Sequence, residues 1–444
     1  MLGVQLAALQ GETPAGCAAA LDLVDGFDQA LEHGFARLGE ERAQAVVALA
    51  AALAGSPLGE RAAEAAAKVA TGVITEDHLL VLAGARTAVL GAVHDALLAT
   101  ADAALGRTRA TWPGQTQAAS ASSAGVASWL AELAITGWRG VDHDLVSAAS
   151  QPIEAVLGDP ATRGLAVLLD GFAAELHASC PIGTMPEIPA RRWGDLWARA
   201  MLLTRGEPAA QATPVTGRLL PLGVDVHEHA TAVQAQLHAV LERPGGEREL
   251  VRASVVAAKV DTITGPAVWR LFGAYPSLLA AMAEHRAVEL SDMPLTPAGD
   301  LLWDESLAKP GDPADPFATA RVLLAESQSP PTPPLHRHPV RLAEPVLVEG
   351  YTGDGRTLRL DGYEIPLTAP PATGPVTTPL VKASKSCVAL LCWDDGRWML
   401  RPLAVQGKKG AHNGEWALAT DAKIAKAGEA VGVLRERAGR LLRK

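Results

Sequence analysis

A chain of 444 residues is too long for one ordinary hydrophobic core, so we expect two to four domains. Its 39 lysine and arginine residues face 49 aspartate and glutamate residues, and the resulting formal charge of −10 argues against sequence-independent binding of nucleic acid over the whole surface. Hydrophobic residues make up 48% of the chain and aromatic residues only 4%. Much of the hydrophobic fraction is alanine, which suits closely packed helices.

The cysteines and the N-terminal segment indicate in which cellular compartment the protein is expected. Cys17, Cys180, Cys387 and Cys392 lie far apart and form no Cys-x-x-Cys pair, which argues against a zinc ribbon or a disulfide-stapled secreted domain. The first basic side chain is Arg37, so we expect no secretory signal. No uncharged stretch has the composition of a transmembrane helix. We therefore expect a cytoplasmic protein, and its bias to alanine, arginine, glycine and proline is typical of a GC-rich bacterial genome.

Residues 1–205 predict an all-α helical domain, because apolar residues recur at spacings of three and four between glycine, proline and capping residues. One long helix is expected to begin after Thr75, as N-cap, and to stop at Gly106. Asp142 is interpreted as a helix cap in preference to one half of a catalytic carboxylate pair. The lack of a repeat of fixed period favours a helical bundle over a solenoid.

The last helix of this domain, within ARRWGDLWARAMLLT, is its most distinctive segment. Trp193 and Trp197 fall on one face, with Arg192 and Arg199 on the neighbouring face. Two tryptophans four residues apart either anchor a core or form a ridge that docks on a partner. The core interpretation is favoured because an amphipathic helix usually buries its apolar face in its own domain. The four residues are kept as interaction candidates.

Residues 215–308 change from a period near four to a period of two, which predicts an antiparallel, β-rich α+β domain. Val233, Ala235, Leu237 and Ala239 alternate with polar residues, and ERPGGER then predicts the turn of a β-hairpin. The stretch GRLLPLGVDVHEH is the expected preceding strand. We interpret the alternation as a hairpin whose polar side chains face outward.

Three histidines in this domain are candidate metal ligands. His227 and His229 would point to the same face of a strand, a geometry that places two imidazoles on one metal, and His238 would have to approach from the paired strand. A catalytic zinc needs three protein ligands and an open position. The favoured interpretation is a polar strand face with no metal and no other cofactor. A metal-dependent hydrolase that uses His227 and His229 is an alternative, and His336 and His338 repeat the spacing further on.

The C-terminal part is predicted in three segments. Residues 309–340 form a proline-rich connection around one short helix. Residues 341–420 predict a small β barrel or sandwich with hairpins at Gly353-Asp354-Gly355 and Asp394-Asp395-Gly396. Residues 421–444 predict a basic helix, which suits an acidic partner, a phosphate backbone or simple solvation.

Basic residues near the C-terminus are the electrostatic candidates. Lys408 and Lys409 lie between glycines, where they would either cradle an anion or form a polar hairpin loop. If the β domain binds oligonucleotides, nearby tryptophans would supply the stacking surfaces. The tryptophans are Trp393, Trp398 and Trp416, and the basic interaction candidates are Lys408, Lys409, Arg435, Arg437 and Arg440.

No catalytic residue is predicted. The sequence lacks Gly-x-Ser-x-Gly, the phosphate-binding Gly-x-x-x-x-Gly-Lys-Ser/Thr and a Gly-x-Gly-x-x-Gly after a strand. Neither an NTPase nor a Rossmann enzyme is therefore supported.

Two stretches, PARRWGDLWARAMLLT and RLLPLGVDVHEHATAVQAQLHAVLE, carry a resemblance that covers less than a tenth of the chain. There the sequence resembles alanine-rich actinobacterial accessory proteins found with MoxR-type AAA+ ATPases and von Willebrand A-domain proteins. The resemblance implies a non-catalytic component that works with both, and it transfers no functional residue. We therefore expect an adaptor or scaffold subunit of a multiprotein complex. The alternatives are the hydrolase above and nucleic-acid binding through the C-terminal β domain.

Overall fold

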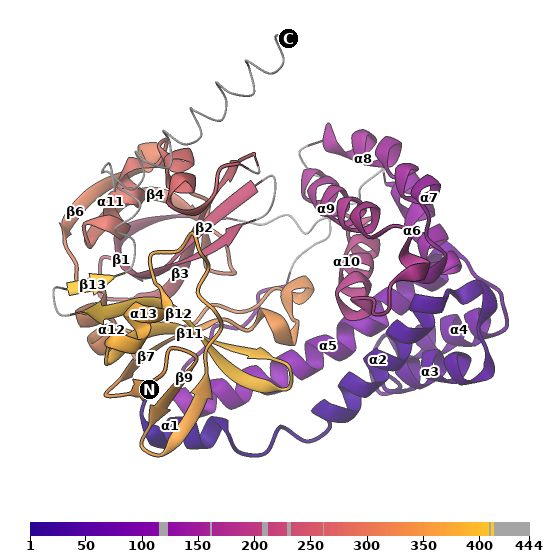
Figure 1. Ribbon diagram of the computed structural model, residues 1–444, viewed down its shortest axis with the longest axis horizontal. Helices are drawn as coiled ribbons and strands as arrows, with labels where there is room; N and C mark the ends of the chain where they lie inside the picture. The colour runs from indigo at the N-terminus through magenta and orange to yellow at the C-terminus, as the bar shows by residue number, and fades with distance from the viewer. Residues whose placement is uncertain are drawn as a thin grey trace, which may run out of the picture.

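The computed structural model describes residues 1–114, 123–159, 162–206, 212–228, 232–260, 262–407 and 410–412. It is a mixed α+β protein with a helical N-terminal part and β-rich later parts (Figure 1). The predicted α+β class and the order of helical and β-rich parts are confirmed at this level. The five predicted domain boundaries stay predictions.

Helix caps in the N-terminal part follow the sequence signals. The Thr75 side chain accepts a hydrogen bond from the His78 amide at 3.2 Å, and Gly106 ends the same helix in the left-handed conformation at φ 67°. Asp142 accepts from the Leu145 amide at 2.9 Å, which confirms it as a cap. The helices in the described residues of this part are α1 (Gly3–Leu9), α2 (Cys17–His33), α3 (Glu40–Ala51), α4 (Gly59–Ala70), α5 (Glu76–Leu105), α6 (Ala124–Thr136), α7 (His143–Ser147), α8 (Ser150–Leu157), α9 (Arg163–Ser179) and α10 (Ala190–Leu203).

Helix α5 runs through two hydrophobic cores. Its first part, including Leu82 and Leu90, packs in the core of the helical part. Its last turns, including Leu97 and Ala101, pack with the C-terminal sheets, beside which α1 also lies (Figure 1). Among the described residues, α5 is the one helix long and apolar enough to cross a bilayer, a segment that the composition of the sequence did not single out. The predicted helical domain therefore shares a core with the C-terminal part.

The middle part is built on one curled six-stranded sheet. The predicted hairpin is confirmed: β2 and β3 are antiparallel, and Glu242 pairs with Arg248 at the turn. Strand β1 pairs with β2 and also with β4, which stands near the other end of the strand order. The sheet therefore curls back on itself. Buried Trp269 and Phe272, with helix α11 (Pro276–Ala283), cover its apolar face. The strands are β1 (Thr213–Glu228), β2 (Ala232–Glu242), β3 (Arg248–Ala258), β4 (Arg286–Leu295), β5 (Asp300–Leu301) and β6 (Ala308–Pro313), in the order β1-β2-β3-β5-β4-β6.

The C-terminal part holds two small sheets that share a core with α1 and α5. The hairpin at Asp394-Asp395-Gly396 is confirmed, since Asp394 pairs with Arg397. The hairpin at Gly353-Asp354-Gly355 is confirmed as well, since Gly353 of strand β8 pairs with Leu358 of the antiparallel strand β9. The preceding strand, β7, is not part of this hairpin and pairs with β11. One sheet is β13 (Gly410–His412), β12 (Arg397–Gly407), β11 (Ser386–Asp394) and β7 (Glu344–Glu349); the other is β10 (Tyr363–Pro366), β9 (Thr357–Leu360) and β8 (Thr352–Gly353), with helix α13 (Thr378–Ala383) beside them.

The proline-rich segment is part of the folded body. It contains the predicted short helix, α12 (Pro316–Leu323), and Phe317 of this helix is completely buried between the middle and C-terminal sheets. The two sheets also touch directly, because a Cβ atom at Gly223 of β1 would lie 2.7 Å from Leu403 Cβ on β12. The helical, middle and C-terminal parts are therefore packed against one another.

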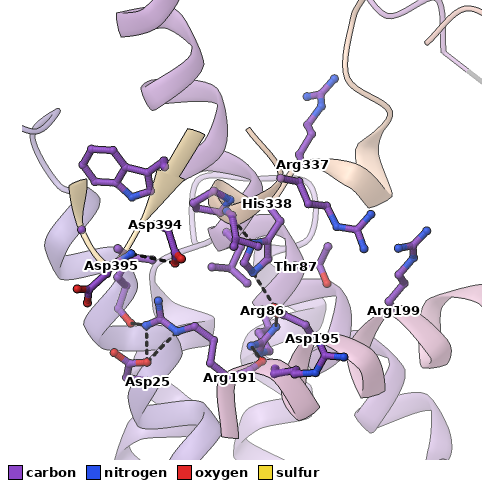
Figure 2. Close-up of a pocket in the computed structure, with 18 of the residues that line it drawn as sticks. Asp25, Arg86, Thr87, Arg191, Asp195, Arg199, Arg337, His338, Asp394 and Asp395 are labelled. Atoms are coloured by element: carbon purple, nitrogen blue, oxygen red, sulfur yellow. Dashed lines mark hydrogen bonds and ion pairs between the residues drawn. The ribbon is translucent and has the colours of Figure 1, made fainter. Parts of the chain in front are cut away.

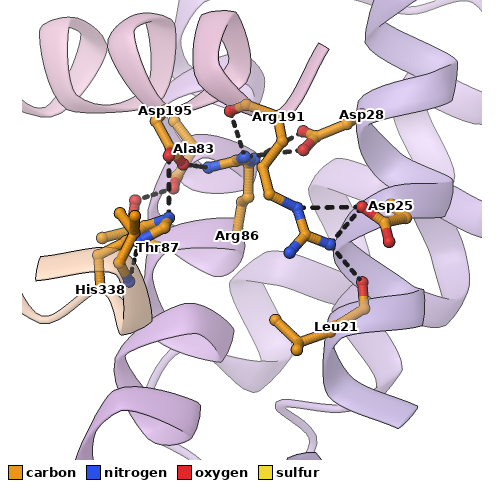
Figure 3. Close-up of polar contacts among 10 residues, drawn as sticks. Leu21, Asp25, Asp28, Ala83, Arg86, Thr87, Arg191, Asp195 and His338 are labelled. Atoms are coloured by element: carbon orange, nitrogen blue, oxygen red, sulfur yellow. Dashed lines mark hydrogen bonds and ion pairs between the residues drawn. The ribbon is translucent and has the colours of Figure 1, made fainter. Parts of the chain in front are cut away.

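A buried arginine on α5 joins three helices (Figure 3). Arg86 is 1% exposed and donates from Nε and Nη2 to the two carboxylate oxygens of Asp28 on α2, at 2.7 and 2.8 Å. It also contacts Asp195 on α10 at 2.5 Å. Burial alone would lower the pKa of Arg86, but Asp28 and Asp195 outweigh it and raise that pKa, so the guanidinium stays charged. Asp195 in turn contacts His338 Nε2 at 2.9 Å.

Replacement of Asp28 should destabilise the helical part, because the buried charge of Arg86 loses the carboxylate that accepts two of its hydrogen bonds. We expect Asp28→Ala to lower the free energy of unfolding by about 3–5 kcal/mol, measured by urea denaturation. Asp25, one turn away on α2, pairs with Arg191 and its side chain is 51% exposed. The matched Asp25→Ala variant should cost less than about 1 kcal/mol. Equal losses in the two variants would contradict the role given to the buried pair.

Candidate functional site

One face of strands β1, β2 and β3 carries a group of polar residues. Cross-strand pairing sets them in rows: Gly223, His238 and Arg252 form one row, and Asp225, Gln236 and Ser254 form the next. Because alternate residues of a strand share a face, the apolar residues between them point into the core behind the sheet. We call the following residues the polar face: Asp225, His227, Gln234, Gln236, His238, Arg252 and Ser254.

The polar face is the floor of a cavity of about 940 Å³. His238 is only 2% exposed, so the prediction that the polar side chains of this hairpin face outward is wrong for His238, whereas Gln234 and Gln236 are half-buried. The physical reason is that other parts of the fold cover this side of the sheet: Arg401 of β12, His94 and Arg199 of the helical part, and a proline-rich stretch of chain. We call this space the central cavity.

The proline-rich stretch 330–342, which we call the strap, lies between the helices and the sheets. Arg109 donates to the Pro330 carbonyl at 2.8 Å, and Arg337 pairs with Asp95 of α5 at 3.0 Å. The Arg199 guanidinium on α10 lies 3.1 Å from His336 Nε2. Since an arginine only donates, His336 Nε2 accepts this hydrogen bond and the imidazole is neutral. The strap is thus tied to α5 and α10 along its length.

Two further pockets border the strap. An outer pocket of about 790 Å³ lies between the helices, the strap and the turn of the β11–β12 hairpin, and Figure 2 shows Asp25, Arg191, Arg337 and Asp394 around it. A more apolar pocket of about 540 Å³ is lined by Trp112 and by residues of α4, α5 and α10, among others. Arg199 lines both pockets as well as the central cavity. The sequence candidate Arg199 therefore lies where all three spaces meet.

Charges on the cavity floor are partly neutralised. Asp225 lies 2.7 Å from Arg401 Nη1 and 3.2 Å from His227 Nε2. Burial would raise the pKa of Asp225, but His227 and Arg401 lower it well below its usual range, so this carboxylate is ionised. Burial lowers the pKa of His238 to about 3, and the charges of Arg252 and Arg401 add to this effect. His238 is therefore neutral, and its Nε2 has no hydrogen-bond partner within the described part of the chain.

The described histidines do not assemble into a metal site. His227 and His238 lie on one face of adjacent strands, but His227 is opposite Gln234, about 13 Å along the strand from His238. His227 Nε2 instead contacts Asp225. Over the described ranges, no three histidine, cysteine, aspartate or glutamate side chains are grouped so that they would hold a metal ion. The candidate ligand His229 lies outside the described residues.

The tryptophan candidates are core residues. Trp193 and Trp197 are 1% and 0% exposed, and Trp197 Nε1 donates to the Leu130 carbonyl at 2.9 Å. The favoured core interpretation is therefore confirmed and the alternative of a docking ridge is wrong, because the apolar face of α10 packs inside its own domain against Phe27 and Trp138. Arg192 is exposed and pairs with Glu175 on α9.

The C-terminal tryptophans do not offer stacking surfaces. Trp393 and Trp398 are 6% and 7% exposed, and their rings pack edge to face on each other at a centroid distance of 5.1 Å. Their burial removes the aromatic contribution expected for oligonucleotide binding. The remaining candidates of this region, Trp416, Lys408, Lys409, Arg435, Arg437 and Arg440, lie outside the described residues.

Comparison of the chain with protein-family models, with curated proteins and with solved structures finds no match. Inference about function therefore rests on the geometry and chemistry of the site. The main feature of that geometry is the central cavity, in which some of the charged side chains form ion pairs and to which all parts of the fold contribute.

Titration of His238 should make stability depend on pH. Below its ordinary pKa of 6.5 the unfolded chain binds a proton at His238, whereas the folded protein does not until about pH 3. The folded protein therefore has its full free energy of unfolding above pH 6.5, where His238 is neutral in both states, and it loses part of it as the pH falls from 6.5 towards 3. We expect His238→Gln to reduce the loss of unfolding free energy between pH 7 and pH 5 by roughly 2 kcal/mol, measured by urea denaturation at each pH.

The matched control is His33→Gln at an exposed position on α2, which should keep the pH dependence of the parent protein. If His238→Gln shows the same loss as the parent, His238 is not held neutral in the cavity.

Proposed function

We propose that this protein is a non-catalytic adaptor that binds a small polar ligand in its central cavity. The observation that carries the proposal is the make-up of the cavity wall, to which the helical part, the curled sheet, the strap and the C-terminal sheet all contribute. A ligand there would contact all of them at once. Binding would therefore stabilise one arrangement of these parts relative to others.

The hydrogen bonds inside the cavity support a binding role over a catalytic one. Ser254 Oγ accepts from Gln236, and His227 is engaged with Asp225. Activated nucleophiles need a base within hydrogen-bond reach, and among the described cavity residues no serine or cysteine is hydrogen-bonded to a histidine. Polar groups that orient a ligand without attacking it are typical of a binding site.

The partners that we propose come from the sequence resemblance: a MoxR-type AAA+ ATPase and a von Willebrand A-domain protein. An adaptor whose parts are held together by a ligand would present different surfaces to such partners in the filled and empty states. The chain would then report the presence of the ligand to the ATPase.

Co-purification tests this proposal. The tagged full chain, purified from its native host at modest salt, should retain an AAA+ ATPase or an A-domain protein in near-stoichiometric amount, identified by mass spectrometry. A Gln236→Leu variant, altered on the cavity floor, should retain clearly less of that partner. The matched control, Gln44→Leu on the exposed side of α3, should retain as much as the parent. Recovery of the parent chain alone would overturn the adaptor function.

A further inference from the structure

Positive charge is in excess around the central cavity. Its lining includes five arginines and three carboxylates, and its four histidines include His238 and His336, whose pKa values burial lowers to about 3. The outer pocket differs, because six arginines face five aspartates there and Asp28 is a further partner for Arg86. The arginines of the central cavity are Arg109, Arg199, Arg252, Arg341 and Arg401, and the carboxylates are Asp225, Asp300 and Glu344.

The excess is concentrated where the strap meets α10. Three of the arginines have carboxylate partners: Arg109 pairs with Asp102 and Glu344, Arg252 with Asp300 and Arg401 with Asp225. Arg341 at the end of the strap pairs with no carboxylate of the described residues, although its side chain reaches both the cavity and the outer pocket. Desolvation by the surrounding chain and the charge of the nearby Arg199 together lower the pKa of Arg341 to about 10, although the Asp195 carboxylate acts in the opposite direction. Two like charges therefore repel each other at this end.

Neutral histidines mark the same region. His336 accepts from Arg199, and the charges of Arg199, Arg341 and Arg252, after burial, hold its pKa low. His238, on the floor beside Arg252, keeps its Nε2 without a hydrogen-bond partner within the described part of the chain. An unpaired polar atom that is 98% buried costs free energy unless a ligand or water satisfies it. Both imidazoles thus border a space that favours a negative charge.

We propose that the central cavity binds an organic phosphate, with its phosphate group between Arg341, Arg199 and Arg252. Guanidinium groups match the oxygen geometry of a phosphate and carry their charge at any physiological pH. His238 supplies a further polar contact. The remaining part of the ligand lies over the floor, where Gln234, Gln236 and Ser254 provide amide and hydroxyl groups for polar substituents such as those of a sugar.

The assignment rests on the proposed function, because it names the ligand of the same cavity. A volume of about 940 Å³ is at the upper end of ordinary small-molecule sites and admits a molecule much larger than a phosphate ion. We therefore expect ribose 5-phosphate and pyrophosphate to bind more tightly than inorganic phosphate.

Calorimetric titration of the full chain with these three compounds tests the inference, with citrate and acetate as carboxylate probes. One site per chain is expected for the two larger phosphates. Arg341→Gln should weaken their binding tenfold or more, because a charge-assisted bond to phosphate is lost. Arg341 forms no ion pair with a carboxylate in the part of the chain that the structure describes, so this variant should fold like the parent. Arg341→Lys, which keeps the charge, should bind with intermediate affinity.

The matched control is Arg359→Gln, an exposed arginine on β9 that pairs with Glu364 and lines none of the three pockets. It should bind as the parent does. Citrate or acetate binding as tightly as pyrophosphate would overturn the assignment to phosphates, as would equal binding by parent and Arg341→Gln. If no phosphate binds while the AAA+ or A-domain partner is still retained, the inference fails and the adaptor function stands.

Discussion

The arrangement of the molecule depends on the neutralisation of one buried charge. Arg86 lies inside the helical part, where a guanidinium is tolerated only if carboxylates surround it. Asp28 and Asp195 meet that requirement from two other helices, which fixes α2, α5 and α10 relative to one another. Asp195 also contacts His338. The same cluster that orders the helices therefore positions the strap, which is the roof of the central cavity.

The cavity follows from the way in which the sheet is covered. A curled sheet with one apolar and one polar face normally buries the first and exposes the second to water. Here α5 continues beyond its own core into the C-terminal part, and β12 packs on β1 at Gly223. Both contacts bring further layers over the polar face, and these layers leave a cavity lined by polar as well as apolar side chains. A polar interior results, and the ion pairs of Arg252 and Arg401 reduce its cost.

Local signals in the sequence predicted much of the secondary structure. Thr75, Gly106 and Asp142 mark helix ends because caps act within a few residues, and the period of two predicted the β2–β3 hairpin for the same reason. The sequence also separated the polar residues of β2 from the apolar ones. It did not reveal that the polar face is covered, because the cover includes residues more than one hundred positions away, such as His94 and Arg401.

The same limit explains the site. Among the sequence candidates, Arg199, His227 and His238 line the cavity. Neither sequence spacing nor residue type brings them together with the arginines Arg252, Arg341 and Arg401. Trp193 and Trp197 were candidates because they are large aromatic residues on one face of a helix, and their burial in the core accounts for this spacing. Arginine in a composition already rich in arginine carries little information until its partners are known. Arg341 stands out only when the fold shows it near Arg199 and without an ion pair to any carboxylate of the described residues.

Two charge clusters thus meet near the C-terminal end of the strap. His338 contacts Asp195, which is held by Arg86, and three residues further on Arg341 lies near Arg199. Asp195 and Arg199 are one turn apart on α10, so the position of this helix affects both. An anion between Arg199 and Arg341 would replace their repulsion by two attractions, and it would bind only that arrangement in which the strap lies against α10. Ligand affinity and strap position are then linked, and the helices that carry Asp28 and Asp195 transmit the link to the rest of the helical part.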